Sequence, residues 1–412
     1  MASFLQLALI IAIILVAAKA AGYLSTRINQ PSVFGEILVG VLLGPSLINI
    51  MELSFVSDTH LSEMISLMGE FGVLLLMFLA GLELHLSDLL KSAKVAAYAG
   101  ILGVLLPVGL GIGFGLLYGM DLNLSIFLGL TLGATSVSIS AQVLIELKMI
   151  RSRVGYGLLG AAVFDDVLVL LLISIFLAVL SGSTGLTGVL IAMVKMLLFL
   201  GVSTAVGLWV LPFIVRMTQN RSISQGTTTL AVVIMLLFGA AAELVGGMAA
   251  ITGAFLAGLM FARTTEKNKI EIGFHSLAYA LFVPIFFVSI GLGVNLWAVD
   301  SSSIWIMLGI TILAILGKVL GSGAGALLSK FSLRESLQIG IGMVSRGEVG
   351  LIIAKIGYDE GYLTDDLFSS IVGMILITTL ITPPLLRAAF HHKKLNSPVD
   401  TPLEILPKEE NS

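Results

Sequence analysis

The sequence predicts an all-α integral membrane protein with thirteen transmembrane helices. Its 412 residues are 57% hydrophobic and 11% charged, and the mean hydropathy is +1.08, whereas a soluble domain carries about 25% charged residues. A helix needs about 20 mostly apolar residues to cross a bilayer, and such stretches recur along the whole chain with short polar connections. A soluble fold is therefore excluded, and the lipid bilayer is an expected partner.

The apolar stretches define the expected helices in order. The N-terminal stretch lacks both a preceding basic region and a small-residue cleavage site, so we expect a retained helix and not a signal peptide. The thirteen expected helices are residues 4–22, 31–48, 63–83, 95–118, 123–146, 155–181, 186–214, 226–243, 247–262, 275–297, 303–328, 336–357 and 366–390. The second and the ninth are short for a membrane span.

Basic residues gather at alternate connections between the expected helices, which indicates how the chain is oriented. Cytoplasmic loops of membrane proteins carry an excess of lysine and arginine. The basic connections lie near residues 19–27, 91–94, 148–153, 216–221, 263–269 and 330–334, and after residue 386. This alternation predicts a multi-pass protein of the cell inner or plasma membrane, with the N-terminus outside and the C-terminus in the cytoplasm.

The odd helix count permits two inverted six-helix repeats on either side of a linker helix, residues 186–214, an arrangement common in secondary transporters. The fifth and twelfth helices, which would be paired by this repeat, both carry polar interruptions: GATSVSIS from Gly133 and MVSRGEVG from Met343. Unwound backbone is tolerated at membrane depth only when protein buries it or when it lines a water-filled cavity. We therefore expect two broken helices that cross.

A few charged residues lie inside apolar stretches, where each costs a few kcal/mol and is by default a functional candidate. Asp165 and Asp166 are adjacent in AAVFDDVLVLLLISIF. Neighbouring helical residues point about 100° apart, so one carboxylate can face an ion while the other faces a partner. Lys318, in ILAILGKVLG, needs a counter-charge, and one of the two aspartates is the natural one.

Other polar features are interpreted structurally. Arg346 and Glu348 lie in the twelfth-helix interruption, where we expect them to compensate each other and the half-helix dipoles. Glu36, Glu70 and Glu243 are interpreted as packing or interface groups, and Lys195 has no assigned role. The scattered basic residues exclude nucleic acid as a partner, and the absence of cysteine excludes thiolate chemistry. No cofactor is expected.

Several motifs together resemble those of the monovalent cation:proton antiporter-2 family, which includes Na⁺/H⁺ exchangers. They are GATSVSISAQVLIELKMIRSRVGYGLLGAAVFDDVL, PSVFGEILVGVLLGP, PIFFVSIGL, the Gly-Lys of the eleventh helix and SRGEVGLIIAKIG. The resemblance implies a homodimer whose subunits each contain an ion-carrying core bundle and a dimerisation bundle, working by an elevator-type movement. The resemblance implies an exchanger domain at 1–395 and a cytoplasmic tail at 396–412. Within the domain, the dimerisation bundle comprises 1–90 and 226–297, and the core bundle comprises 91–181 and 303–390. The nucleotide-binding domain that follows the exchanger domain in some relatives is not expected.

The resemblance also implies roles for individual residues. Asp166 is similar to the essential carboxylate that binds the cation, here Na⁺, and the proton, whereas Asp165 is similar to the partner of Lys318. Thr135 and Ser136 correspond to the polar helix break beside the ion. Potassium exchangers of the family often carry Gln-Asp in place of Asp-Asp, so Asp165 favours Na⁺, with Li⁺ as a further substrate. Ser345, where many members have proline, is a small departure from the family pattern.

These expectations lead to a secondary active antiporter, not an enzyme. One carboxylate that binds either Na⁺ or H⁺ makes the two ions compete, and that competition is the basis of exchange. A K⁺/H⁺ antiporter of the same family, or a channel or sensor built on the same fold, stays an alternative. An intramembrane aspartyl protease is disfavoured because its two aspartates must converge from separate helices.

Overall fold

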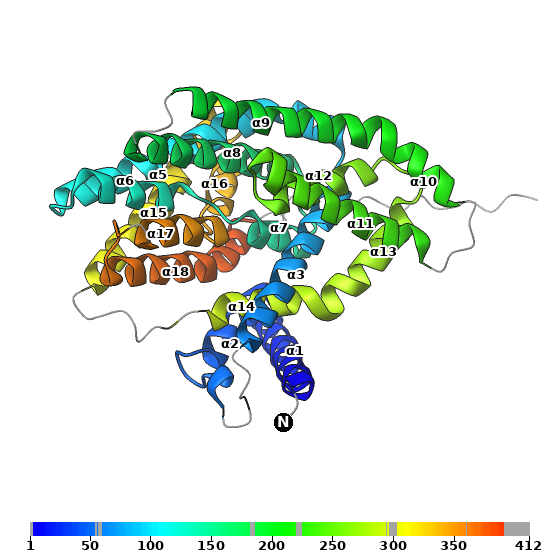
Figure 1. Ribbon diagram of the computed structural model, residues 1–412, viewed down its shortest axis with the longest axis horizontal. Coiled ribbons are helices and arrows are strands. Elements are labelled where there is room, and N and C mark those ends of the chain that lie inside the picture. The colour runs from blue at the N-terminus through cyan, green and yellow to red at the C-terminus, as the bar shows by residue number, and fades with distance from the viewer. Residues whose placement is uncertain are drawn as a thin grey trace, which may run out of the picture.

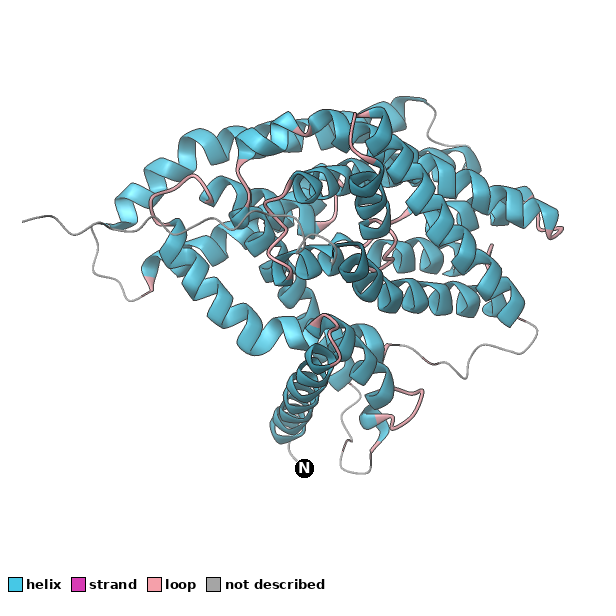
Figure 2. Ribbon diagram, turned by 180° about the vertical axis from the view of Figure 1, so that it is seen from behind, coloured by secondary structure: helices cyan, strands magenta, loops and turns pink. Residues whose placement is uncertain are grey.

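The regular structure consists of helices throughout the described part of the chain (Figures 1 and 2). The computed structural model describes residues 3–53, 56, 60–181, 186–219, 225–293, 295, 303–359 and 361–390. Ten of its helices are long and apolar enough to cross a membrane, so the protein is a multi-pass membrane protein. The expected cytoplasmic tail, 396–412, lies outside the described residues.

The elements follow one another as a series of long helices with short connections. The first half contains α1 (Ser3–Arg27), α2 (Ser32–Leu43), η1 (Ile50–Glu52), α3 (Leu61–Glu83), α4 (Leu86–Lys91), α5 (Ala93–Leu117), α6 (Leu122–Gly133), α7 (Val137–Glu146), α8 (Arg153–Ser181), α9 (Leu186–Ala205), η2 (Val206–Val210) and α10 (Leu211–Gln219). The second half contains α11 (Gly226–Ala241), η3 (Ala242–Gly246), α12 (Ala250–Phe261), α13 (Lys267–Leu277), η4 (Ala278–Phe282), α14 (Val283–Leu292), α15 (Ile304–Leu328), α16 (Leu333–Gly342), α17 (Glu348–Asp359) and α18 (Asp365–Phe390).

These helices account for the expected apolar stretches, although not every stretch is a full span. Shorter apolar helices occur at Ser32–Leu43 and Ala250–Phe261, the two stretches expected to be short, and at Val349–Tyr358, which is half of a broken helix. Elements η2, η3 and η4 are π-helical turns within longer helices. Such turns widen a helix locally and occur often at functional sites.

The helices pack in two groups. Helices α5, α6, α8 and α15 to α18 contact mainly one another, and they lie together on the left of Figure 1. Helices α1 to α3 and α11 to α14 form a second set of contacts, in which α12 packs along α3 and α14 along α2. Helix α7, which follows the first helix break, contacts both groups, through α18 and α8 on one side and through α3 and α2 on the other.

Close backbone contact between α3 and α12 depends on two glycines. A Cβ atom on Gly81 would lie 2.1 Å from the carbonyl oxygen of Phe255, and one on Gly258 would lie 2.0 Å from that of Phe78. Small residues allow helix backbones to approach in this way inside a membrane, where van der Waals packing drives association. The contact fixes α12 against α3 at the level of the functional site.

Candidate functional site

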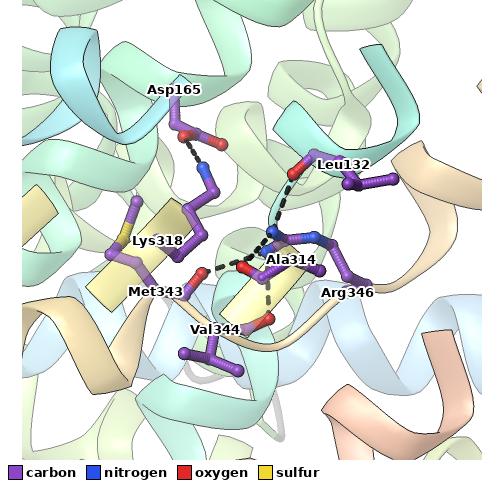
Figure 3. A network of polar contacts seen from close by, with 7 residues as sticks. All are labelled: Leu132, Asp165, Ala314, Lys318, Met343, Val344 and Arg346. Carbon is purple, nitrogen blue, oxygen red and sulfur yellow. Dashed lines mark hydrogen bonds and ion pairs between the residues drawn. The ribbon is translucent and has the colours of Figure 1, made fainter. Parts of the chain in front are cut away.

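A buried ion pair joins α8 to α15. The Lys318 ammonium donates a hydrogen bond to Asp165 Oδ1 (Figure 3), and both side chains have 0% exposure. Both helices pack against α5, which holds the two side chains at the same depth. Removing one partner of a buried pair leaves an uncompensated charge and typically costs about 3–5 kcal/mol. Asp165 and Lys318 therefore depend on each other.

Arg346 compensates the exposed backbone ends of the broken helices. Its guanidinium is fully buried, and Nη2 donates to the carbonyl oxygens of Leu132 at 2.7 Å and Ala314 at 3.1 Å. Nη1 donates to those of Val344 at 2.9 Å and Met343 at 3.2 Å (Figure 3). The C-terminal carbonyls of a helix lack intrahelical partners and carry partial negative charge. Arg346 thus neutralises the C-terminal ends of two half-helices.

The structure gives the position of Glu348 in the chain but not the contacts of its side chain. Glu348 is the first residue of α17, so it lies directly after the break, but its side chain is outside the described part of the structure. The described partners of the Arg346 side chain are backbone carbonyls. The sequence analysis expected these residues to compensate each other and the half-helix dipoles, but it did not specify which carbonyls Arg346 would contact.

The two breaks are joined by reciprocal hydrogen bonds. The backbone N–H of Ser136 donates to the Ser345 carbonyl at 2.9 Å, and the Ser345 hydroxyl donates to the Ser136 carbonyl at 2.6 Å. The hydroxyl of Ser140 also donates to the Gly342 carbonyl at 2.5 Å. These bonds satisfy unwound backbone that lipid cannot solvate and fix the crossing point. The Ser136 side chain lies 3.1 Å from the Ser138 hydroxyl.

Asp166 faces the other helix group. It is 7% exposed, and its Oδ2 accepts a hydrogen bond from the Thr252 hydroxyl of α12 at 3.2 Å. A cavity of about 10 Å³ lies beside it, lined by residues that include Met77, Val137 and Phe255. That volume holds roughly one water molecule. Asp166 therefore lies in an enclosed space between the two helix groups, whereas Asp165 is held inside one of them.

Two buried side-chain oxygens, one of Asp165 itself and one of a neighbouring threonine, lack hydrogen-bond partners in the described structure. They are Thr135 Oγ1 and Asp165 Oδ2. Thr135 lies beside Asp165, but the geometry does not join these two oxygens by a hydrogen bond. Unpartnered buried polar atoms are uncommon in proteins and call for an explanation such as an absent ion or water. Hydroxyl and carboxylate oxygens are hard ligands suited to an alkali cation.

Comparison with known proteins identifies the family. The model of the family described as "Sodium/hydrogen exchanger, transmembrane" matches residues 10–390. This chain belongs to that sodium/hydrogen exchanger family. The resemblance drawn from the sequence motifs is thereby confirmed.

Two curated relatives match along most of their length. The Na⁺/H⁺-K⁺ antiporter GerN of Bacillus cereus is 39% identical over 384 residues, which cover 93% of this chain and 96% of the relative. The Na⁺/H⁺ antiporter of Enterococcus hirae is 37% identical over 380 residues, covering 92% and 96%. A solved structure, the sodium proton antiporter MjNhaP1 from Methanocaldococcus jannaschii, matches with a TM-score of 0.66 over 93% of this chain and 97% of that one. Because its identity is 16%, this likeness shows the fold alone.

The exchanger brings most of the residues selected from sequence into one region. Asp165, Lys318 and Thr135 lie at the helix breaks, and Asp166 lies one residue further along α8. Sequence reasoning missed Thr252, whose only signal was a hydroxyl in the apolar stretch AAITGAFLAG. Within the described residues, no group of three or more histidine, aspartate or glutamate side chains could hold a metal ion.

A polar bridge connects α7 of the exchanger to the second helix group. The backbone N–H and hydroxyl of Ser32 donate to the Glu146 carboxylate at 2.9 and 2.5 Å. The Tyr279 hydroxyl donates to Gln142 Oε1 at 2.7 Å, and Gln142 in turn donates to Glu146 at 3.0 Å. Lys19 donates to the Tyr279 carbonyl at 2.9 Å. The Lys19 bond joins α1 to η4 within the second group, whereas a large displacement of α7 from α2 and η4 would break the bonds of Glu146 to Ser32 and of Gln142 to Tyr279.

Proposed function

We propose that this exchanger is a secondary active antiporter that exchanges Na⁺ for H⁺ across the membrane. The observation that carries the proposal is the enclosed carboxylate of Asp166, whose cavity is also lined by Val137 directly after the first helix break. The neighbouring residue Asp165 and Thr135 beside it each have an unpartnered buried oxygen. Family membership and the antiporter names of GerN and the Enterococcus hirae protein support the same activity. An alkali cation is the substrate and needs no cofactor.

The proposed exchange follows from competition for one carboxylate. When Asp166 binds a proton it is neutral and holds no cation, and when it is ionised it attracts Na⁺ into the oxygen-lined space. Thr135 Oγ1 and Asp165 Oδ2 would supply further ligands. A cation drawn toward Asp165 competes with the Lys318 ammonium for the same carboxylate, so cation binding loosens that ion pair. The two aspartates and Lys318 would then titrate as one coupled unit.

The proposed movement is an elevator in which the core bundle carries the ion past the dimerisation bundle of a homodimer. The two packing groups of helices support this division, and Asp166 lies where they meet. We further propose thirteen spans in two inverted repeats, made up of the ten long helices, the two short ones and the broken α16–α17 pair. The N-terminus would lie outside and the C-terminus in the cytoplasm, as the basic connections indicate.

Potassium is the second candidate substrate, because the printed name of GerN includes K⁺. Na⁺ is favoured because this chain carries Asp165 where potassium exchangers of the family often carry glutamine. Li⁺ stays a further candidate substrate.

The test uses purified exchanger in proteoliposomes with an acidic lumen and a fluorescent dye that reports the pH gradient. Addition of Na⁺ or Li⁺ should recover dye fluorescence with saturation, and K⁺ should require a much higher concentration. Recovery by K⁺ at the lower concentration would assign the exchanger to potassium. An unsaturable current with no dependence on the pH gradient would assign it to the channels.

A further inference from the structure

A hollow of about 500 Å³ opens at the ends of the long helices α5, α8 and α15, well away from the aspartates. It is lined by residues of three segments: the α4–α5 junction, the start of α8 and the turn between α15 and α16. Arg153, which lines it, precedes Asp165 by roughly 18 Å along the helix axis, at about 1.5 Å per residue. The hollow is therefore a feature separate from the ion site.

The lining of the hollow carries more cationic than anionic side chains. Four cationic side chains, Lys91, Lys94, Arg151 and Arg153, and one carboxylate, Asp88, line it, while Glu83 and Glu335 beside it pair with Arg151 and Arg153. Among the described residues, Lys94 forms no ion pair, and its ammonium lies 5.9 Å from the centre of its neighbouring Tyr98 ring. A concave surface lined by one sign of charge concentrates the field and attracts ions of the other sign. An anion is the ligand class that this lining favours.

The remaining cations have local partners that position them without using all their donors. Lys91 pairs with Asp88 at 2.8 Å, and Arg151 binds Glu83 through Nε and Nη2. A guanidinium has five N–H donors in a fixed fork, so Arg151 keeps donors for a ligand. Its side chain is 50% exposed. The ion pairs hold the basic groups in place around the hollow.

Aromatic and backbone groups prearrange the same surface. The Arg153 guanidinium lies 3.9 Å above the centre of the Phe331 ring, which fixes its plane. The hydroxyl of Tyr156, a residue with 7% exposure, accepts a hydrogen bond from the His85 N–H at 3.3 Å and has its own proton to donate. Helices α5 and α8 both begin at the hollow, whereas α15 ends there, so two N-terminal partial positive charges outweigh one C-terminal partial negative charge.

We propose that this hollow binds the phosphate group of a phosphate ester. Arginine forks match phosphate oxygens in bidentate geometry, and lysines add point charges. The volume is much larger than a bare phosphate ion and lies in the range of sites that hold a small organic molecule, so the hollow has room for the organic group of a phosphate ester. Two sources share this chemistry, the headgroup of an anionic phospholipid and a soluble phosphate ester. The inference does not depend on the proposed transport, because it concerns equilibrium binding.

The test is thermal unfolding of the whole exchanger in detergent micelles during titration with phosphatidylglycerol, phosphatidylcholine or glycerol 3-phosphate. Phosphatidylglycerol should raise the unfolding temperature more than phosphatidylcholine. The double variant K91Q/K94Q should bind it about tenfold more weakly, because two charge-assisted hydrogen bonds are lost. Both lysines are exposed, so this variant should unfold like the natural protein when no lipid is added.

Lys269 provides a matched control. Its ammonium lies 2.8 Å from the carboxylate of Glu266, three residues earlier, and its side chain is 74% exposed. Lys91 lies at the same distance from Asp88, also three residues earlier, and its side chain is 76% exposed. K91Q should weaken phosphatidylglycerol binding several-fold while K269Q leaves it unchanged. Equal losses in the two variants would indicate diffuse attraction to anionic lipid and overturn the proposal, as would equal stabilisation by both lipids together with no effect of glycerol 3-phosphate. Stabilisation by glycerol 3-phosphate that K91Q/K94Q weakens would support a soluble ester as the ligand.

Discussion

Asp165 and Asp166 are neighbours in sequence but occupy opposite environments. Asp165 has 0% exposure and is bound to Lys318 within one helix group, whereas Asp166 faces the other group across a small cavity and accepts a hydrogen bond from Thr252. The difference arises because adjacent helical residues point about 100° apart and α8 lies at the boundary between the groups. One carboxylate can therefore organise the core while the other meets the transported ion.

The largest effect should come from removing the charge that meets the ion. D166N is nearly isosteric and takes away the only full negative charge among the described residues that line the small cavity, so Na⁺-dependent recovery of the pH dye should fall below detection. The protein should still fold, because the amide can accept the Thr252 hydrogen bond. Thermal unfolding of the same preparation supplies the control. Normal exchange by D166N would remove the distinction between the two aspartates.

Removing Lys318, the partner of Asp165, should lower the stability of the protein more than it weakens ion binding. K318A leaves a buried carboxylate uncompensated, which should lower the free energy of unfolding by about 3–5 kcal/mol. Replacing both partners, as in D165N/K318Q, removes both charges and should recover most of that loss. Thermal unfolding in detergent measures both variants. A K318A protein as stable as the natural chain would mean that the buried pair contributes nothing to the core.

Thr252 tests the other side of the comparison. A hydrogen bond to a carboxylate favours its ionised form, so T252V should make the proton a stronger competitor at Asp166. The apparent KM for Na⁺ at fixed pH should rise by about tenfold, since hydrogen bonds to charged groups contribute about 1.5–3 kcal/mol. The activity profile should move to higher pH. T252S keeps the hydroxyl and should behave like the natural protein, and a similar profile for T252V and T252S would exclude this role.

The smallest expected effect concerns the crossing of the breaks. S345A removes the hydrogen bond to the Ser136 carbonyl and should lower the free energy of unfolding by about 1 kcal/mol. S289A removes a hydroxyl whose bond to the Phe286 carbonyl lies within its own helix turn, and it should be milder. Chemical or thermal unfolding compares the two. A greater loss in S289A would show that the crossing is held by other contacts.

The buried charges could be predicted from the sequence because burying a charge is costly, and the structure buries Asp165, Asp166 and Lys318. Asp165, Asp166 and Lys318 were conspicuous in apolar stretches, where chance retention of a charge is disfavoured. Polar interruptions at Gly133 and Met343 likewise indicated the broken helices, and the structure places a break after each of α6 and α16.

Other features depend on tertiary contacts that no local pattern contains. A threonine in an apolar helix can bond a carbonyl of its own helix, so the hydrogen bond from Thr252 of α12 to Asp166 of α8 could not be predicted from the local sequence. Arg346 binds the Leu132 carbonyl, 214 positions away in the chain, and a carbonyl carries no sequence signature. The basic hollow was visible only as separate basic connections, because its walls come from three segments.

The most direct test of the division between the aspartates compares D165N/K318Q with D166N in the same proteoliposome assay. D165N/K318Q removes the buried ion pair but keeps the carboxylate that meets the ion, so it should retain saturable Na⁺-dependent proton movement, with altered charge transfer per cycle. D166N should show none. Exchange by D166N together with an inactive but folded D165N/K318Q would contradict the division and assign the ion to Asp165.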